Sequence, residues 1–360
     1  MSTTSIRDSQ IPVIAIASES GRNRFSSVHG SPLDGRARTL SVEWTAGMSD
    51  GERAAALDAV LTNAEALVVA PWIQRMPRFD DARWQHAPRL KVIAGTFDNR
   101  FAHWIDVADA QRRGIALIDT SRSMTPTVAE FALAMILNLI RDIPTAIDLV
   151  RRGNWTKGSW DQEGFIHGDL TGRRVGLAGF GSINRRLAEL LIPFHGRIAT
   201  CDPYVADVDL DRYGVARAGS LVELANKSEI FVIGIPPTPS TQGIISREVI
   251  DALKSGSLFV LVTRMAVVDQ AALWRRAEAG DIRAAIDVFE PEPPPPDATF
   301  RTSPFVLPTP HIAGNTFACH RRCFTTACND ALAVLEGREP VYPVTVRDDL
   351  LYQGRPAAPA

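Results

Sequence analysis

Cysteine is scarce in this sequence, with four among 360 residues. Three of them, Cys319, Cys323 and Cys328, lie close to His320, which suggests a metal site or reduced thiols on a helix. No Cys-x-x-Cys pair occurs, and the spacing does not place all three thiols on one helical face. We therefore expect reduced cysteines and no bound metal.

An excess of charge of one sign is also absent. Lys and Arg total 39 against 41 Asp and Glu, a formal net charge of -2, which argues against nucleic acid or an anionic membrane as a partner. The apolar run Val13–Ala17 is too short for a signal peptide or a membrane span, and we find no longer uncharged run. We expect a cytoplasmic protein whose partner is a small molecule.

Short apolar runs alternating with amphipathic stretches are abundant. This pattern is typical of βαβ units, and it occurs in two series separated by a long helical stretch that begins at Pro126 and that Pro144 divides. We predict an α/β fold with two doubly wound parallel sheets and strands at Val13–Ala17, Ala66–Ala70, Val92–Ala94, Ile115–Ile118, Val175–Ala178, Ile198–Cys201, Ile230–Ile235, Leu258–Val262 and Ala284–Asp287. Helices are expected at Asp50–Leu61 and about Thr316–Leu335.

The segment RRVGLAGFGSINRRLAELL predicts a dinucleotide site, because a glycine turn connects a strand to an amphipathic helix. Gly179 would allow the tight turn, and Gly181 would let the backbone approach a pyrophosphate at the helix N-terminus. Asn184 replaces the third glycine of the usual pattern. Asp202, at the end of the next strand, would bind ribose hydroxyls and repel a 2′-phosphate, so NAD is the expected cofactor. The predicted cofactor loop comprises Gly179, Phe180, Gly181, Ser182 and Ile183.

Four ionisable residues follow later strands: Arg264, Asp287, Glu292 and His311. In a doubly wound sheet these strand ends lie at the ligand-binding edge. A guanidinium there can bind an anionic substrate, and an imidazole with a carboxylate partner can transfer a proton.

With these features the sequence resembles the D-isomer-specific 2-hydroxyacid dehydrogenase family, which includes phosphoglycerate, D-lactate and glyoxylate/hydroxypyruvate enzymes. The resemblance extends from about Leu90 to Gly337. The resemblance is specific because several short motifs occur in the same order and at the same spacing as in the family. These motifs are Leu90-Lys-Val-Ile, Thr127-Val-Ala-Glu130, the Gly179 turn, Ile235-Pro-Pro-Thr-Pro, Thr263-Arg264, Asp287-Val-Phe-Glu-Pro-Glu-Pro and Pro310-His311.

The resemblance implies a role for each matching residue. Arg264 would bind the substrate carboxylate, His311 would be the general acid/base, and Glu292 would favour the protonated form of His311. Asp287 would hold the nicotinamide carboxamide. The other implied contacts are Thr127, Pro236 and Thr263 with the cofactor, and the backbone of Gly95 and Thr96 with the substrate carboxylate.

The family also implies a domain layout. A flavodoxin-like substrate domain would comprise residues 1–120 and 311–345, with a Rossmann NAD-binding domain inserted at 121–310 and a tail at 346–360. A homodimer would form through the helical region after Thr125.

The sequence departs from the family in two places. Met265 stands where a glycine usually follows the arginine, and the loop Gly95–Trp104 lacks the usual Gly-x-Gly. Phe97, Phe101 and Trp104 in this loop either line a pocket for a bulky substrate or pack as loop core.

Three related functions remain as alternatives. Formate dehydrogenases of this fold carry glutamine where Glu292 stands, which argues against that activity. Phosphite dehydrogenases keep the Arg/Glu/His set, and NADH-binding corepressors of this fold can keep it too, so neither is excluded by sequence.

Overall fold

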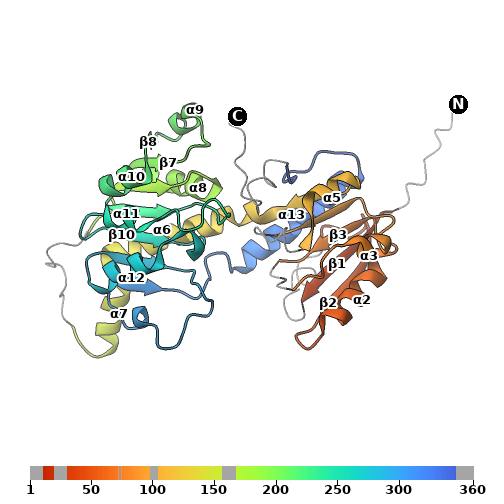
Figure 1. Cartoon of the computed structure of the whole chain (residues 1–360), viewed down its shortest axis with the longest axis horizontal. Coiled ribbons are helices and arrows are strands. Elements are labelled where there is room, and N and C mark those ends of the chain that lie inside the picture. Colours follow the sequence, from red (N-terminus) through yellow and green to blue (C-terminus); the bar gives the residue numbers. More distant parts are fainter. Residues whose placement is uncertain are drawn as a thin grey trace. The chain divides into compact units, whose positions relative to one another are not determined.

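The computed structural model describes residues 11–19, 31–71, 73, 75–97, 104–155 and 168–345. The chain divides into two compact units, each with its own parallel sheet (Figure 1). The first unit comprises Met1–Met124 and Phe317–Gln353, and the second is built on Thr125–Thr316. This confirms the predicted fold class, with two parallel α/β sheets.

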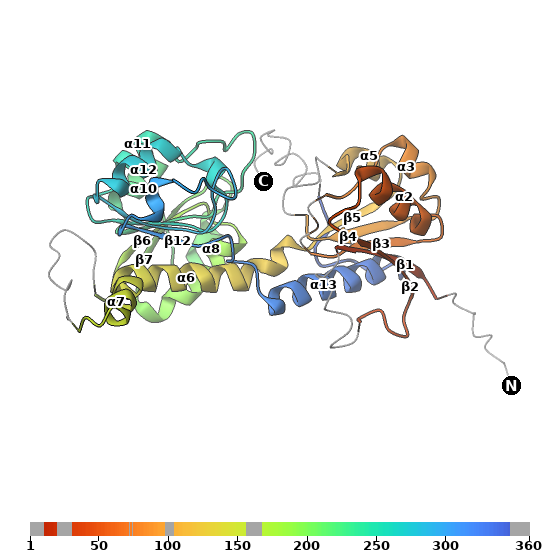
Figure 2. The same ribbon diagram turned by 90° about the horizontal axis from the view of Figure 1, so that it is seen from below.

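The first unit has a five-stranded parallel sheet in the order β2-β1-β3-β4-β5. Helices α2, α3 and α5 cover one face and α13 covers the other (Figure 2). Because both faces are buried, β1, β3 and β4 are nearly continuous apolar runs. The elements are β1 Val13–Glu19, β2 Arg38–Trp44, α2 Asp50–Leu61, β3 Ala66–Val69, α3 Asp81–Gln85, β4 Val92–Gly95, α5 Val107–Arg112, β5 Ala116–Asp119, the 3-10 turn η1 Thr120–Met124 and α13 Phe317–Leu335.

The second unit has a seven-stranded parallel sheet in the order β12-β11-β10-β9-β6-β7-β8. Helices α6, α7 and α8 lie on one side of it, and α10, α11 and α12 on the other (Figure 2). The elements are α6 Thr125–Arg141, α7 Ile143–Arg151, β6 Arg174–Ala178, α8 Ser182–Leu191, η2 Ile192–Phe194, β7 Arg197–Cys201, α9 Asp207–Asp211, β8 Ala216–Arg217, α10 Leu221–Lys227, β9 Ile230–Ile233, α11 Arg247–Asp251, β10 Leu258–Leu261, η3 Met265–Val267, α12 Gln270–Glu278, β11 Arg283–Ile286, η4 Thr299–Arg301 and β12 Val306–Pro308.

The strand order of the second unit reverses between β6 and β9, which are neighbours in the sheet. In open α/β sheets the crevice at such a reversal, beyond the carboxyl ends of the strands, is the usual ligand site. The turn at Gly179 follows β6, and Gly234 follows β9. The topology therefore places the predicted cofactor loop at the expected ligand-binding edge.

The boundaries between the units lie after Met124 and after Thr316, whereas we expected them after residues 120 and 310. His311 accordingly belongs to the second unit and not to the segment 311–345. Its backbone N–H donates to the carbonyl of Asp287, and the N–H groups of Ile312 and Ala313 donate to the Asp287 carboxylate. These bonds attach the His311 turn to β11. The predicted tail at 346–360 lies outside the described residues.

The long helical stretch divides where the sequence predicted. Helix α6 ends at Arg141, and α7 begins at Ile143 with Pro144 in its first turn. Between them Asp142 has a left-handed backbone with φ 48°. The Asp142 carboxylate forms an ion pair with Arg283 at 2.5 Å, which fixes this break to the start of β11.

Residues Thr120–Arg141 are long and apolar enough to cross a membrane, judged by length and composition alone. Our expectation that no such stretch follows the N-terminal strand was therefore wrong. Helix α6 is apolar because one of its faces, which includes Val128, Ala132 and Ile136, is buried in its unit. A core helix of this kind passes the same test as a membrane span.

Strand β2 was missed by the sequence analysis. Its sequence RTLSVEW contains no apolar run, because it is an edge strand and only Val42 and Trp44 are buried. Helix α2, by contrast, has the predicted bounds, since Ser49 and Glu52 form a reciprocal capping box at its start.

Candidate active site

The glycine turn after β6 has the geometry of a phosphate-binding loop. Gly179 has a left-handed φ of 80°, and a Cβ there would lie 3.0 Å from Ile235 Cγ1. Gly181 is the N-cap residue of α8 and provides no side-chain cap, and a Cβ on it would meet no atom of the described residues within 4 Å. The first N–H groups of α8 and its positive dipole end are therefore available for an anion. These residues fit the pyrophosphate of a dinucleotide.

Asp202 connects the end of β7 to this turn. Its Oδ2 accepts a hydrogen bond from the backbone N–H of Phe180 at 2.7 Å, and its Oδ1 accepts one from Tyr204 N–H at 2.9 Å. A carboxylate has about four acceptor positions, so the group retains capacity for ribose hydroxyls. The ring of Phe180 is fully buried, so this residue meets the cofactor site through its backbone.

The carboxylate of Glu292 and the imidazole of His311 form a close pair. Glu292 Oε2 lies 2.8 Å from His311 Nδ1. Glu292 Oε1 accepts a hydrogen bond from the backbone N–H of Phe289, also at 2.8 Å. Both side chains are partly exposed, at 37% and 28%. The predicted partnership of these two residues is thus present in the geometry.

Asp287 has a structural role that the sequence analysis did not assign. Its carboxylate is fully buried and accepts hydrogen bonds from the Thr309 hydroxyl at 2.6 Å and from Ile312 N–H and Ala313 N–H at 2.9 Å. Burial raises the pKa of Asp287, and these donors together with the charge of His311 oppose the increase. His311 itself has a left-handed φ of 53°. Asp287 thus anchors the turn that carries the imidazole.

Arg264 follows β10, at the same edge of the sheet. Burial lowers the pKa of its guanidinium, while the charges of Glu292 and Asp287 oppose that effect. The guanidinium donates to the carbonyl of Thr263 at 2.6 Å. The neighbouring Met265 is 2% exposed and packs in the core of the unit, so a side chain at this position has a packing role.

The strands β10, β11 and β12 are parallel neighbours, so the arginine, the two carboxylates and the imidazole meet at one edge. Comparison with known proteins identifies the family of this chain. The NAD-binding domain model of the D-isomer specific 2-hydroxyacid dehydrogenases matches residues 133–313. The chain belongs to this family. Its enzymes are NAD-dependent oxidoreductases, and NAD is the cofactor that the match indicates.

Several curated proteins are similar to this dehydrogenase. A glyoxylate reductase of Thermofilum pendens is 33% identical over 277 residues, which cover 74% of this chain and 77% of the relative. A D-3-phosphoglycerate dehydrogenase of Methanocaldococcus jannaschii is 32% identical over 257 residues, 70% of this chain but 47% of the relative. The dehydrogenase thus matches about half the length of that relative.

Solved structures share the fold. A 2-hydroxyacid dehydrogenase from Ketogulonicigenium vulgare has a TM-score of 0.71 and 26% identity, and the alignment covers 92% of this chain and 98% of the other. A Pyrococcus horikoshii protein has a TM-score of 0.73 and 27% identity, with 94% and 96% covered.

The remaining predicted cofactor residues lie in the second unit. Thr127 is in the first turn of α6, Thr263 donates its hydroxyl proton to the carbonyl of Ile233, and Pro236 is exposed after β9. Gly95 is the last residue of β4 in the first unit, and Thr96 follows it. A Cβ on Gly95 would lie 2.8 Å from Val69 Cβ, so that glycine is needed for the close approach of β3.

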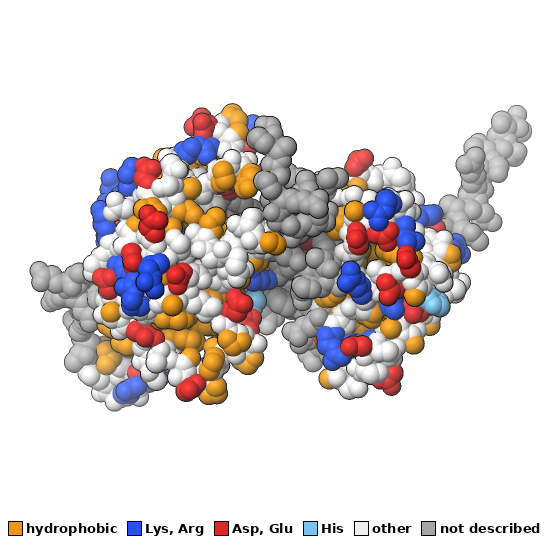
Figure 3. Space-filling view, in the orientation of Figure 1, with side chains coloured by type: hydrophobic (Ala, Val, Ile, Leu, Met, Phe, Trp, Pro, Cys, Tyr) orange, Lys and Arg blue, Asp and Glu red, His pale blue; other side chains and the backbone are white. Residues whose placement is uncertain are grey.

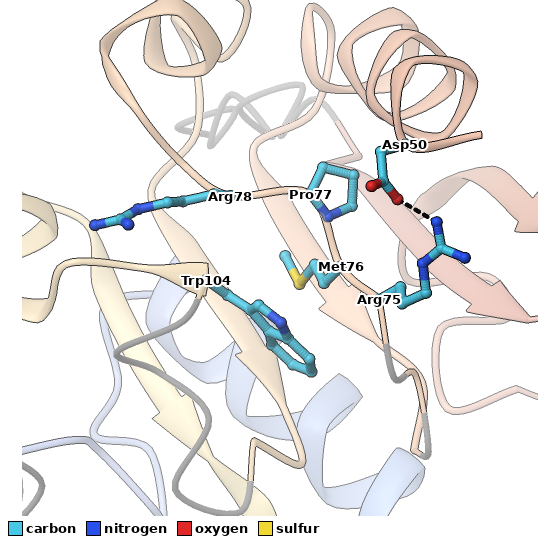
Figure 4. A pocket seen from close by; sticks show the side chains of 6 residues that line it. All are labelled: Asp50, Arg75, Met76, Pro77, Arg78 and Trp104. Atoms are coloured by element: carbon cyan, nitrogen blue, oxygen red, sulfur yellow. Dashed lines mark hydrogen bonds and ion pairs between the residues drawn. The ribbon is translucent and has the colours of Figure 1, made fainter.

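The aromatic residues of the substrate loop differ in environment. Phe97 is fully buried, and its ring centroid lies 5.9 Å from that of Trp104 in an edge-to-face arrangement. This favours the loop-core interpretation for Phe97. Phe101 lies outside the described residues. Trp104 lines a pocket of about 350 Å³ within the first unit (Figure 4). The other lining residues are Asp50, Arg75, Met76, Pro77 and Arg78, with an ion pair between Asp50 and Arg75 at 2.5 Å.

The cysteine cluster is part of the packing of α13. Cys319, Cys323 and Cys328 are buried, and burial raises the pKa of the Cys328 thiol. Within the described part of the chain no group of three metal-binding side chains occurs. On the face shown in Figure 3, basic and acidic side chains of the described residues are intermixed.

Proposed function

We propose that this dehydrogenase interconverts a small 2-ketoacid and the corresponding D-2-hydroxyacid, with His311 as the general acid/base. The 2.8 Å pair of His311 and Glu292, at the sheet edge that carries Arg264 and the glycine turn, is the observation behind this proposal. A carboxylate that is hydrogen-bonded to one ring nitrogen orients the imidazole for proton transfer at the other.

The proposed reduction divides the chemistry between cofactor and protein. Bound NADH supplies the hydride that adds to the carbonyl carbon. Arg264 binds the substrate carboxylate and polarises the carbonyl oxygen, since a guanidinium matches a carboxylate with two parallel hydrogen bonds. His311 donates its proton to that oxygen and takes it back during oxidation. Glu292 orients the ring through Nδ1, which leaves proton transfer to Nε2.

Glyoxylate and hydroxypyruvate are the first substrates we propose. The glyoxylate reductase of Thermofilum pendens and a hydroxypyruvate reductase of Thermotoga maritima are each 33% identical to this chain over their aligned regions. Both compounds carry the carboxylate and the adjacent carbonyl that the proposed roles of Arg264 and His311 require.

The test follows the near-ultraviolet absorbance of NADH with glyoxylate, hydroxypyruvate, pyruvate and larger 2-ketoacids. We expect NADH oxidation with at least one of them, and its loss in H311A. NADH binding by H311A, measured by fluorescence titration, should equal that of the unmodified protein. Tight NADH binding without oxidation of NADH by any ketoacid would contradict the proposal. NAD⁺ reduction by phosphite would then indicate the phosphite activity, and its absence would favour a corepressor role.

We also propose a homodimer formed through α7. Ile143, Ile147 and Val150 lie at helical spacing, and their exposed fractions are 39%, 45% and 54%. An exposed apolar helix face of this kind is typical of a protein interface. Sedimentation velocity should show a dimer, and I147D should weaken the association of the two subunits. A monomer at micromolar protein concentration would contradict the proposed dimer. The cytoplasmic location stays a prediction from the sequence.

A further inference from the structure

Gly234 and Asn184 face each other at the point where the strand order reverses. Gly234 follows β9, and Asn184 is in the first turn of α8. A Cβ on Gly234 would lie 2.3 Å from Asn184 Nδ2, 2.6 Å from its Cγ and 3.0 Å from its Oδ1. No positive φ is required at Gly234, so the glycine is needed for space and not for backbone conformation. The Asn184 side chain occupies the space that a side chain on residue 234 would take.

Asn184 is connected directly to the cofactor turn. Its Nδ2 donates a hydrogen bond to the carbonyl of Gly179 at 2.7 Å, and the residue is 1% exposed. Gly179 is the left-handed residue of the turn, and its own N–H donates to the carbonyl of Cys201. The turn is therefore held on both sides of this residue, by β7 through the N–H and by Asn184 through the carbonyl.

The asparagine is not explained by packing alone. Its Oδ1 is buried and accepts no hydrogen bond from the described residues. A buried acceptor without a partner is unfavourable, and glycine at this position would not create one. The hydrogen bond to Gly179 is the compensating interaction.

We propose that Asn184 is a positioning residue for the pyrophosphate-binding turn, and that Gly234 supplies the close helix–strand contact that the third glycine supplies in the G-x-G-x-x-G pattern. Compared with the usual pattern, the small residue lies just after the facing strand β9 and not in the helix. The helix position carries an amide that donates a hydrogen bond to the Gly179 carbonyl. This inference concerns cofactor binding and depends neither on the ketoacid nor on proton transfer by His311.

If Asn184 and Gly234 act together, substitutions at the two positions should have coupled effects on the affinity for the nucleotide. G234A pushes the amide away from Gly179, so we expect the Kd for NADH to rise about tenfold. N184A removes the amide and should raise the Kd by a similar factor. In the double variant N184G/G234A the methyl group on residue 234 has room. The Kd of the double variant for NADH should therefore equal that of N184G, and the losses from the two single substitutions should not add. Fluorescence titration with NADH and competition by ADP-ribose, which retains the pyrophosphate, give these values without turnover.

Gly176 provides a matched control for general damage to the unit. It lies in β6, where a Cβ would meet Ser228 Oγ at 2.0 Å and Leu224 Cγ at 3.1 Å, away from Asn184. G176A should lower the Tm, and N184G should not relieve its effect. N184A, which leaves Gly234 in place, should keep most of the Tm and show faster amide hydrogen exchange at Gly181 and Ser182. Unchanged NADH and ADP-ribose affinity in N184A, or summed losses in N184G/G234A, would overturn the proposal.

Discussion

The Nδ1 atom of His311 lies 2.8 Å from Oε2 of Glu292, while Oε1 of the same carboxylate accepts the backbone N–H of Phe289. Both oxygens of Glu292 are thereby fixed, one by the loop that carries it and one by the imidazole. The ring of His311 is held in turn by a backbone turn that Asp287 anchors. The pair is oriented from both ends, as proton transfer at a defined atom requires.

Glutamine at position 292 should slow the reaction. E292Q keeps the shape of the side chain but replaces the charge-assisted hydrogen bond to His311 Nδ1 with a weaker neutral one. We expect kcat/KM for ketoacid reduction to fall about 10- to 100-fold, because the imidazole is less firmly oriented for proton transfer. The measurement is kcat/KM with the ketoacid that is reduced fastest. E290Q, in the same exposed loop, serves as the control, and an equal loss in both variants would contradict the assignment.

Lysine at position 264 should separate substrate binding from cofactor binding. R264K keeps the charge but loses the planar pair of donors that matches a carboxylate. We expect the KM for the ketoacid to rise about tenfold or more, with a lower kcat and an unchanged Kd for NADH. R275K alters an arginine that pairs with Asp251 on the surface and should behave as wild type. A weakened NADH affinity in R264K would place this residue at the cofactor instead.

The aromatic stack behind the Glu292 loop should affect catalysis at a distance. Phe300 packs against both Trp274 and Phe289, with ring centroids 4.8 and 4.9 Å away, and those two rings are 6.5 Å from each other. F300L loosens Phe289, whose N–H holds Glu292, so we expect a loss of about 1 to 3 kcal/mol of stability and a lower kcat for ketoacid reduction. The control is F259L in the Phe231–Phe259 pair. F259L should lower the Tm by a similar amount without changing kcat; an equal change in kcat in both variants would count against the coupling.

The sequence predicted most buried strands and the residues at their ends, because a strand buried on both faces is a short apolar run and strand ends of a parallel sheet share an edge. The edge strand β2 escaped this reasoning, since its side chains are mostly exposed. We also overlooked that Thr120–Arg141 is long and apolar enough to cross a membrane. A buried core helix and a membrane span can share this length and composition.

The structural role of Asp287 was not predictable from spacing. Its hydrogen bonds reach Thr309, Ile312 and Ala313, more than 20 residues away, and only the folded turn brings these groups together. The same is true of Asn184 and Gly234, which are 50 residues apart. The departure at Asn184 was visible in the sequence, but the glycine that accommodates it was not.

Asparagine at position 202 should relax the choice of nucleotide. D202N keeps an acceptor for Phe180 N–H but removes the charge that repels a 2′-phosphate. Arg217, which donates to the Asp202 carbonyl at 2.9 Å, is then a nearby cation for that phosphate. We expect the preference for NADH over NADPH to fall about 100-fold in kcat/KM. D207N, which alters the ion-pair partner of Arg217, should leave NADH use intact; an unchanged preference in D202N would contradict the role of Asp202.

Glutamine at position 229 should destabilise the second unit in a pH-dependent way. Glu229 precedes β9 and accepts hydrogen bonds from Arg174 N–H at 2.9 Å and from Arg173 at 3.0 Å, across the start of β6. Burial alone would raise the pKa of this carboxyl, but these donors and the two arginine charges lower it below 4.5 overall. Because the pKa is lower in the folded state, the carboxylate stabilises the fold above about pH 4.5, and this contribution disappears as the pH falls through the folded-state value.

We therefore expect E229Q to lose about 1 to 2 kcal/mol at neutral pH and to approach the stability of the unmodified protein in acid. Urea unfolding at a series of pH values measures the difference directly. E223Q provides the comparison, because Glu223 also has a lowered pKa, through hydrogen bonds from Lys227 and Gly219, but lies exposed on the surface. Its substitution should change the stability little at any pH. A loss in E229Q that persists undiminished in acid would mean that packing, and not the carboxylate charge, is responsible.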